Sequence, residues 1–192
     1  MSKNTKLNSI RIIAGKWRGR RLPVLDYLGL RPTTDRVRET VFNWLMNDIS
    51  GARCLDVYAG TGALGLECLS RGAAFVKFIE SKQPVLRSIQ NSIDILYPED
   101  DRNVSLTRAD AMSALQMVCE EKFDIVFLDP PFNDDLIKTS ATLLEKNYWL
   151  SDKAIIYIEC EANKGDLVLP ENWIKYKSGR AGQSAYYLYR RE

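Results

Sequence analysis

The sequence predicts an α/β protein with a doubly wound, Rossmann-like sheet, mostly parallel with one antiparallel C-terminal strand, and a small N-terminal β-hairpin extension. From residue 53 onward, short apolar runs alternate with helical segments, as in parallel sheets covered on both faces. Glycines follow the first of these runs, which is typical of a nucleotide-binding turn. The last two apolar runs are separated by residues 178–182 alone, and so short a connection requires an antiparallel pair.

The elements follow in order along the chain. Residues 9–22 alternate basic and apolar side chains and predict two short strands joined by a turn near Gly15. Residues 34–48 predict a helix, with an apolar stripe that begins at Val37 and Val41. We expect strands near 53–58, 75–80, 103–107, 123–128, 154–160, 173–178 and 184–190, and helices near 62–71, 82–97, 110–120 and 134–146.

The composition is that of one globular domain with a small appendage. Of 192 residues, 45% are apolar and 27% are charged. No apolar run reaches the roughly 18 residues of a membrane span, and the N-terminus lacks the apolar segment of a signal peptide. We therefore expect a cytoplasmic protein without a membrane partner. We also expect a monomer, although the sequence does not establish the oligomeric state.

Charge is distributed unevenly between two parts of the chain. Residues 1–38 hold ten basic and two acidic residues, for a net charge of +8, whereas the remainder carries −6. A basic segment of this kind predicts contact with a polyanion, although residues 1–7 alone could be a solvated tail. We therefore divide the chain into a basic hairpin and linker, 1–38, which we expect to bind a polyanion, and a main domain, 39–192.

Cysteine and histidine usage excludes several chemistries. The four cysteines form no close pair in the sequence, which favours free thiols over disulfides or a zinc site; they are Cys54, Cys68, Cys119 and Cys160. There is no histidine, the commonest general base and metal ligand. The sequence therefore excludes hydrolysis by a serine–histidine–aspartate triad, and we expect no metal.

A cofactor site is predicted after the first strand of the sheet. Gly60, Gly62 and Gly65 match G-x-G-x-x-G, a weak signal that NAD-binding proteins share. Asp56 precedes this turn, where its carboxylate would oppose a pyrophosphate but attract the ammonium group of a methionine moiety. The turn therefore favours a methionine-bearing cofactor, with Tyr58 and Thr61 among its contacts.

Two further acids follow the next strands. Glu80 ends the second strand, 20 residues after Gly60, where an acid can accept both ribose hydroxyls; the alternative is a solvated charge. Asp110 follows the third strand and could accept from an adenine amino group, while the backbone N–H of Ala111 serves the ring. Asp110 could equally cap the following helix, and the two roles are compatible.

A rigid acidic loop, Asp129-Pro130-Pro131-Phe132, is predicted to be catalytic. The prolines fix the backbone, so the Asp129 carboxylate and the Pro130 carbonyl point in fixed directions. These two acceptors could hold both hydrogens of an exocyclic amine and free its lone pair to attack a sulfonium methyl group. Phe132 could stack on an extruded base. The alternative is a Pro-Pro strand exit with a core phenylalanine.

The basic N-terminal part supplies the predicted RNA contacts. Phosphate contacts would make RNA binding salt-dependent. Trp17 could stack on a base, although packing against the domain is the commoner role, and Arg36 could instead pair with a neighbouring acid. The predicted contacts are Arg11, Lys16, Trp17, Arg18, Arg20, Arg21, Arg36 and Arg38.

These motifs resemble a known family. Asp56–Gly62 together with Asp129–Phe132 looks like an S-adenosylmethionine-dependent amino-methyltransferase. The segments from Arg11 to Pro23 and from Arg31 to Leu45 are more specific and resemble ribosomal RNA small subunit methyltransferase D. That resemblance implies a Rossmann-like methyltransferase sheet, S-adenosylmethionine as cofactor, and methylation of the N2 amine of guanine 966 of 16S rRNA in assembled or assembling 30S subunits.

The resemblance also implies roles for single residues and leaves alternatives. It places Asp56, Gly60, Gly62, Glu80 and Asp110 at cofactor positions and Asp129 to Phe132 at the catalytic motif. Tyr58 and Thr61 stand where the family has Phe and Ser, which leaves cofactor affinity open. The alternatives are a DNA adenine-N6 methyltransferase, an NAD-dependent oxidoreductase and a non-catalytic RNA-binding assembly factor.

Overall fold

The sheet has seven strands and the predicted fold class is confirmed. A computed structural model describes residues 9–25, 34–97, 103–131, 134–163 and 165–192. The sheet order is β5-β4-β3-β6-β7-β9-β8, and β3 to β7 pair in parallel, while β9 is antiparallel to both of its neighbours. The strands are β3 (Arg53–Asp56), β4 (Phe75–Glu80), β5 (Val104–Arg108), β6 (Phe123–Leu128), β7 (Leu150–Glu161), β8 (Trp173–Ala181) and β9 (Ser184–Arg191).

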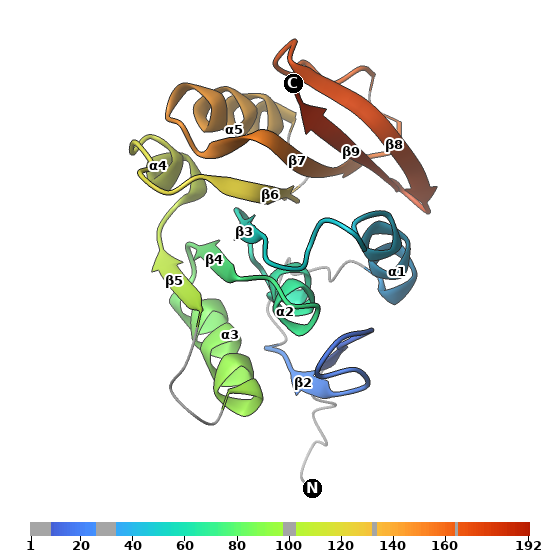
Figure 1. Ribbon diagram of the computed structural model, residues 1–192, viewed down its shortest axis with the longest axis vertical. Helices are drawn as coiled ribbons and strands as arrows, with labels where there is room; N and C mark the ends of the chain where they lie inside the picture. Colours follow the sequence, from blue (N-terminus) through green and yellow to red (C-terminus); the bar gives the residue numbers. More distant parts are fainter. Residues whose placement is uncertain (1–8, 26–33, 98–102, 132–133, 164) are drawn as a thin grey trace, which may run out of the picture.

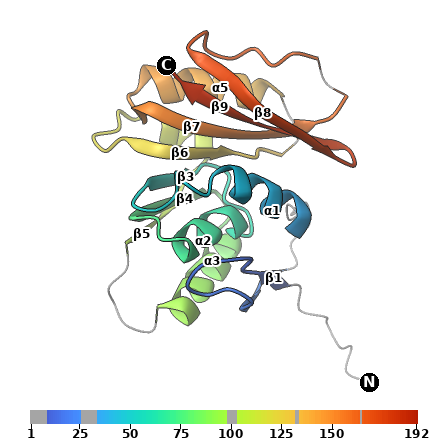
Figure 2. The same ribbon diagram turned by 45° about the vertical axis from the view of Figure 1, so that its right-hand side comes forward.

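Helices cover both faces of this sheet (Figures 1 and 2). On one face lie α1 (Asp35–Trp44), α2 (Ala63–Ser70) and α3 (Gln83–Leu96). On the other lie α4 (Ala111–Leu115) and α5 (Asp134–Lys146). Each face has its own apolar core, one centred on Phe42, Leu66 and Phe78, the other on Leu55, Val126 and Ile156. These two cores fix the strand ends, from which the site is built.

The N-terminal hairpin packs beneath α2 and α3, away from the sheet (Figure 2). Its strands are β1 (Ser9–Arg11) and β2 (Arg21–Pro23), paired in antiparallel register. Ile10 and Leu22 face each other and are buried, whereas Arg11 and Arg21 face each other at the surface. The alternation of basic and apolar residues therefore separates a packed face from a cationic face.

Several predicted boundaries are wrong for physical reasons. Helix α4 ends at Leu115 rather than near 120, because the Asn147 amide donates to the Leu115 carbonyl and the Trp149 indole donates to the Met117 carbonyl. Strand β7 begins at Leu150, four residues earlier than predicted, through its pairing with Phe123. Helix α1 stops at residue 44 and continues as turns, and β8 runs through residue 181.

Candidate active site

A cavity of about 420 Å³ lies at the carboxyl ends of the parallel strands. This is the edge at which open α/β sheets bind ligands, and the volume falls in the usual range for small-molecule sites. Residues that follow β3, β4, β5 and β6 all reach it, so acids far apart in the sequence share one space. The predicted residues that line it are Asp56, Tyr58, Gly60, Thr61, Glu80, Asp110, Ala111, Asp129, Pro130 and Pro131.

The glycine turn brings the backbone to the edge of this cavity. Gly60 and Gly62 have φ of 51° and 76°, a region that favours glycine. Gly62 does not itself line the cavity: it shapes the turn and precedes α2, and its role as a cofactor contact stays a prediction. Gly65 allows α2 to approach β4, because a Cβ there would lie 2.2 Å from the Phe78 ring.

Asp56 is a buried acid whose charge has little compensation, meaning that few hydrogen-bond donors or cations offset it. It is 2% exposed and accepts a hydrogen bond of 3.2 Å from the Gly65 N–H. Burial, opposed by that hydrogen bond and assisted by the charge of Glu80, raises the pKa of Asp56 from 3.8 to about 7. Among the described residues, no cationic side chain forms an ion pair with it. A cationic ligand group would supply the missing charge.

Glu80 ties the glycine turn to the end of β4. Its carboxylate accepts from the Gly60 N–H at 3.1 Å and from the Lys82 N–H at 2.8 Å. Both bonds hold one acid at the cavity wall, where its orientation is fixed before a ligand arrives. Fixed acceptors of this kind suit a pair of hydroxyl groups.

The remaining predicted cofactor residues occupy the same wall. The Asp110 carboxylate accepts from the Ser113 N–H at 3.1 Å, so it caps α4 as well as lining the cavity. Ala111 begins α4 beside it. The Tyr58 hydroxyl lies 2.8 Å from the hydroxyl of Ser140 on α5, and this contact fixes the side chain of a residue that lines the cavity. Thr61, which lies between Gly60 and Gly62 in the turn, also lines the cavity.

The Asp129 loop leaves β6 directly into the cavity. Asp129 is half-buried, Pro130 is buried and Pro131 is exposed, and all three line the space. Phe132 lies outside the described residues, so its predicted stacking role stays a prediction. The rigid part of the motif therefore faces the same space as the Asp56 carboxylate.

Sequence reasoning missed one acid in this cavity. Glu159 on β7 is 8% exposed, lines the space and accepts a hydrogen bond of 2.8 Å from the Tyr157 hydroxyl. Its signal was an acid inside an otherwise apolar run, on the strand that comes after Asp129 in the sequence. Ser184 on β9 and Thr34, which caps α1, also line the cavity and were not predicted.

The predicted RNA contacts divide into exposed and buried residues. Two predictions are wrong. Trp17 is 4% exposed and packs edge-to-face on Tyr97, with ring centres 4.8 Å apart, so it is not available to stack on a base. Arg38 is 1% exposed and donates to the Arg11 carbonyl and the Asp35 carboxylate. The exposed residues are Arg11, Lys16, Arg18, Arg20, Arg21 and Arg36.

A fully buried acid, Glu67 of α2, anchors the hairpin. Its carboxylate accepts from the Ile13 and Ala14 N–H groups at 2.8 and 3.0 Å, and it pairs with Arg71 at 2.8 Å. Arg38 lies 3.9 Å from the same carboxylate. The hairpin is therefore a fixed part of the molecule rather than a loosely tethered arm.

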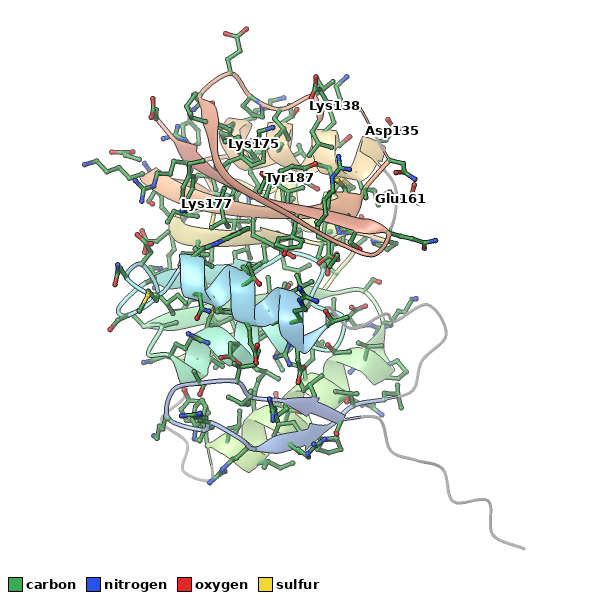
Figure 3. All side chains as sticks on the ribbon, turned by 90° about the vertical axis from the view of Figure 1, so that its right-hand side faces the viewer. Asp135, Lys138, Glu161, Lys175, Lys177 and Tyr187 are labelled. Carbon is green, nitrogen blue, oxygen red and sulfur yellow. The ribbon has the colours of Figure 1, made fainter. Side chains whose placement is uncertain are left out.

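A second hollow lies along β8 and β9, at the opposite end of the molecule from the hairpin (Figure 3). It is lined by Tyr187 and Tyr189, and the Lys175 ammonium lies 5.4 Å from the Tyr187 ring centre.

Within the described ranges, no cluster of three or more potential metal ligands occurs. Nor does any described helix have the length and apolar character to span a membrane.

Fold, glycine turn and acidic strand ends together define the class of a Rossmann-like methyltransferase. The profile of a family described as conserved hypothetical protein 95 matches residues 10–190. Ribosomal RNA small subunit methyltransferase D from Escherichia coli is 49% identical over 183 residues, covering 95% of this chain and 90% of its own. The protein of the same name from Haemophilus influenzae is 44% identical, covering 94% and 93%. The chain therefore belongs to the ribosomal RNA small subunit methyltransferase D family.

Solved structures agree with this assignment. A putative methyltransferase from Escherichia coli superposes with a TM-score of 0.87 at 45% identity, covering 96% of this chain and 99% of its own. A putative methylase from Haemophilus influenzae gives 0.82 at 39% identity, with the same coverage. The similarity spans the hairpin as well as the sheet.

Proposed function

We propose that this protein transfers a methyl group from S-adenosylmethionine to the N2 amine of a guanine in 16S rRNA, at position 966 by resemblance to its family, within the small ribosomal subunit. The observation that carries the proposal is that one cavity joins Asp56, Glu80 and Asp110 to the Asp129 loop. A cationic amino acid, a ribose and a base-borne amine can then meet in one space. Because its substrate would be the ribosomal subunit, we place the activity in the cytoplasm.

The residues present fit S-adenosylmethionine. Asp56, a buried acid without a cationic partner among the described residues, suits the ammonium of the methionine moiety. Glu80 is oriented to accept the ribose hydroxyls, and Asp110 with the Ala111 N–H suits the adenine edge. When bound, the cofactor supplies an electrophilic methyl group whose bond to sulfur breaks with its electron pair remaining on sulfur.

The Asp129 loop would position the target amine. The Asp129 carboxylate and the Pro130 carbonyl accept the two amine hydrogens, which bends the nitrogen towards tetrahedral geometry and frees its lone pair. Once methylated, the nitrogen is cationic and loses a proton to the Asp129 carboxylate or to water. Positioning of this kind can contribute roughly 7–11 kcal/mol, so no strong base is required.

The exposed face of the hairpin would bind the RNA backbone. Arg11 and Arg21 stand directly opposite each other on its two strands, with Lys16 and Arg18 exposed at its turn. Like charges placed side by side repel one another, and phosphate groups relieve that repulsion. The hairpin is fixed to α2, the helix that follows the glycine turn, so RNA held there has a defined position relative to the cavity.

Transfer of labelled methyl from S-adenosylmethionine tests the proposal. Unmethylated 30S subunits and free 16S rRNA are the two substrates, and the product is identified by nucleoside analysis. We expect N2-methylguanine from subunits. Recovery of N6-methyladenine, or no transfer to either substrate, contradicts the proposal.

The variant Asp129→Ala separates an enzyme from a non-catalytic assembly factor. We expect RNA binding to persist while methyl transfer falls by about 1,000-fold or more, because the group that positions the amine is lost. Transfer that survived the change would contradict the role given to Asp129.

A further inference from the structure

Asp129 directly follows the last residue of β6, and Glu159 lies at the corresponding position on the neighbouring strand β7. Leu128 of β6 is in register with Ile158 of β7, so the residues that follow each of them leave the pair as neighbours. Adjacent strands are about 4.8 Å apart, which is a suitable spacing for two acceptors that contact neighbouring N–H groups on one base edge. Both residues line the same cavity.

The Glu159 carboxylate is held in place by Tyr157. The Tyr157 hydroxyl donates to it at 2.8 Å from within the core. Burial, followed by the negative charges of Glu159 and Asp129, raises the pKa of Tyr157 well above its usual value. Tyr157 therefore remains a hydrogen-bond donor to the Glu159 carboxylate.

We propose that Glu159 determines the choice of base by accepting the N1–H of the target guanine while Asp129 and Pro130 hold its N2 amine. This inference rests on the proposed function and adds to it a reason for guanine. Glu159 contacts the base edge and takes no part in the bond changes at the methyl group.

The chemical basis is the group that lies next to each exocyclic amine. Guanine presents N1–H, a donor, beside its amine, whereas adenine and cytosine present an acceptor nitrogen there. A carboxylate pairs with the donor and is repelled by the acceptor lone pair. Sites built to bond a substrate N–H reject analogues that lack it far more strongly than apolar pockets discriminate by size. The Asp129 loop alone fits any of the three amines, so Glu159 supplies the discrimination.

The analogue 2-aminopurine isolates this contact. It keeps the amine at C2 but has an acceptor at N1, and it also lacks the oxygen at C6. We would assemble 30S subunits from semi-synthetic 16S rRNA carrying guanine or 2-aminopurine at the target position. Labelled methyl transfer then gives kcat/KM for both substrates with wild type, Glu159→Gln, Tyr157→Phe and Glu161→Gln.

We expect wild type to favour guanine over 2-aminopurine by at least about 100-fold. Glu159→Gln should reduce this preference for guanine to below about tenfold, because the glutamine amide can donate to the N1 acceptor of 2-aminopurine. Tyr157→Phe keeps the Glu159 carboxylate but removes the hydroxyl that holds it in place. The ratio of kcat/KM for guanine over 2-aminopurine should therefore fall severalfold. Glu161→Gln is the matched control: Glu161 ends the same strand (Figure 3) outside the cavity lining, and its ratio should match wild type.

Cofactor affinity, measured by calorimetry, should stay within about twofold in Glu159→Gln and verifies its fold. A wild-type ratio near one, or an unchanged ratio in both Glu159→Gln and Tyr157→Phe, overturns the inference and leaves the proposed function standing. Absence of transfer from wild type to guanine-bearing subunits overturns the proposed function itself, so the two failures are distinguishable.

Discussion

Two buried carboxylates, Glu67 beneath the sheet and Asp56 at its edge, have opposite surroundings. Glu67 accepts two backbone N–H groups and pairs with Arg71, with Arg38 close by. Asp56 accepts one N–H group from Gly65, and its pKa rises to about 7. A compensated buried acid stabilises the fold, whereas an under-compensated one stores a cost that a cationic ligand can relieve. Compensation thus separates the structural acid from the ligand-binding acid.

Removal of the compensated acid should have the largest effect on stability. Glu67→Gln removes the charge that faces Arg71 and Arg38 and weakens the bonds to the hairpin backbone. We expect a loss of about 3–5 kcal/mol in the free energy of unfolding, the usual cost of breaking a buried ion pair. Urea denaturation measures it. The control is Glu39→Gln on the exposed side of α1, for which a change below about 0.5 kcal/mol is expected.

Asp56, the under-compensated acid, should have the opposite effect: its ionisation should lower the free energy of unfolding as pH rises. With an unfolded pKa of 3.8 and a folded pKa of about 7, the folded protein binds more protons than the unfolded chain between these values. The contribution of Asp56 to stability therefore falls as pH rises from about 4 to about 7, by up to about 4 kcal/mol. Asp56→Asn should remove this fall, leaving a variant that gains stability relative to wild type as pH rises. Denaturant titrations at pH 5 and pH 8 give the difference, and an identical pH slope for the two proteins would contradict the assignment.

Gly15 tests how tightly the hairpin is fixed. A Cβ at Gly15 would lie 1.9 Å from the Ser70 carbonyl oxygen, whereas one at Gly19 would meet nothing within 4 Å, although both have φ near +80°. Gly19→Ala therefore measures the backbone cost alone, about 1 kcal/mol. Gly15→Ala adds the clash, so we expect a loss larger by about 1–3 kcal/mol. Equal losses in thermal denaturation would show that the hairpin can move away from α2.

The smallest effects should come from the exposed hairpin charges. Arg18→Ala removes a side chain at the surface and should change stability by less than about 0.5 kcal/mol. If Arg18 contacts a phosphate, the slope of log K against log salt for RNA binding should fall by about 0.7–1. Lys153→Ala, an exposed residue near the start of β7, serves as the control and should leave the slope unchanged.

Local patterns predicted most of the fold and much of the cavity. Alternating apolar runs gave the parallel strands, and acids that directly follow strands, such as Asp56 and Asp129, line the cavity because strand ends meet at one edge. Glu67 could not be assigned, since its partners Ile13 and Ala14 are more than 50 residues away in sequence. The two roles weighed for Trp17 could not be separated for a similar reason: its packing partner Tyr97 belongs to another segment.

The burial of Arg38 likewise depends on contacts that no local pattern contains. Arg38 lies on a helix rich in charged residues, two positions after the exposed Arg36, and nothing in the local sequence distinguishes the two arginines. Only the packing of the hairpin against α1 and α2 encloses its guanidinium group, through the Arg11 carbonyl and the Glu67 carboxylate. Sequence therefore locates charges, and the tertiary structure decides which of them reach solvent.

Cofactor binding at pH 6 tests most directly the claim that Asp56 awaits a cation. At this pH the Asp56 carboxyl is mostly protonated in the free protein, because its pKa is about 7. Binding the methionine ammonium should ionise it, so calorimetry in buffers of different ionisation enthalpy should detect release of close to one proton per S-adenosylmethionine. Methylthioadenosine, which lacks the amino acid moiety, should release none, and neither ligand should release a proton from Asp56→Asn. Binding of S-adenosylmethionine to wild type without proton release would contradict the account.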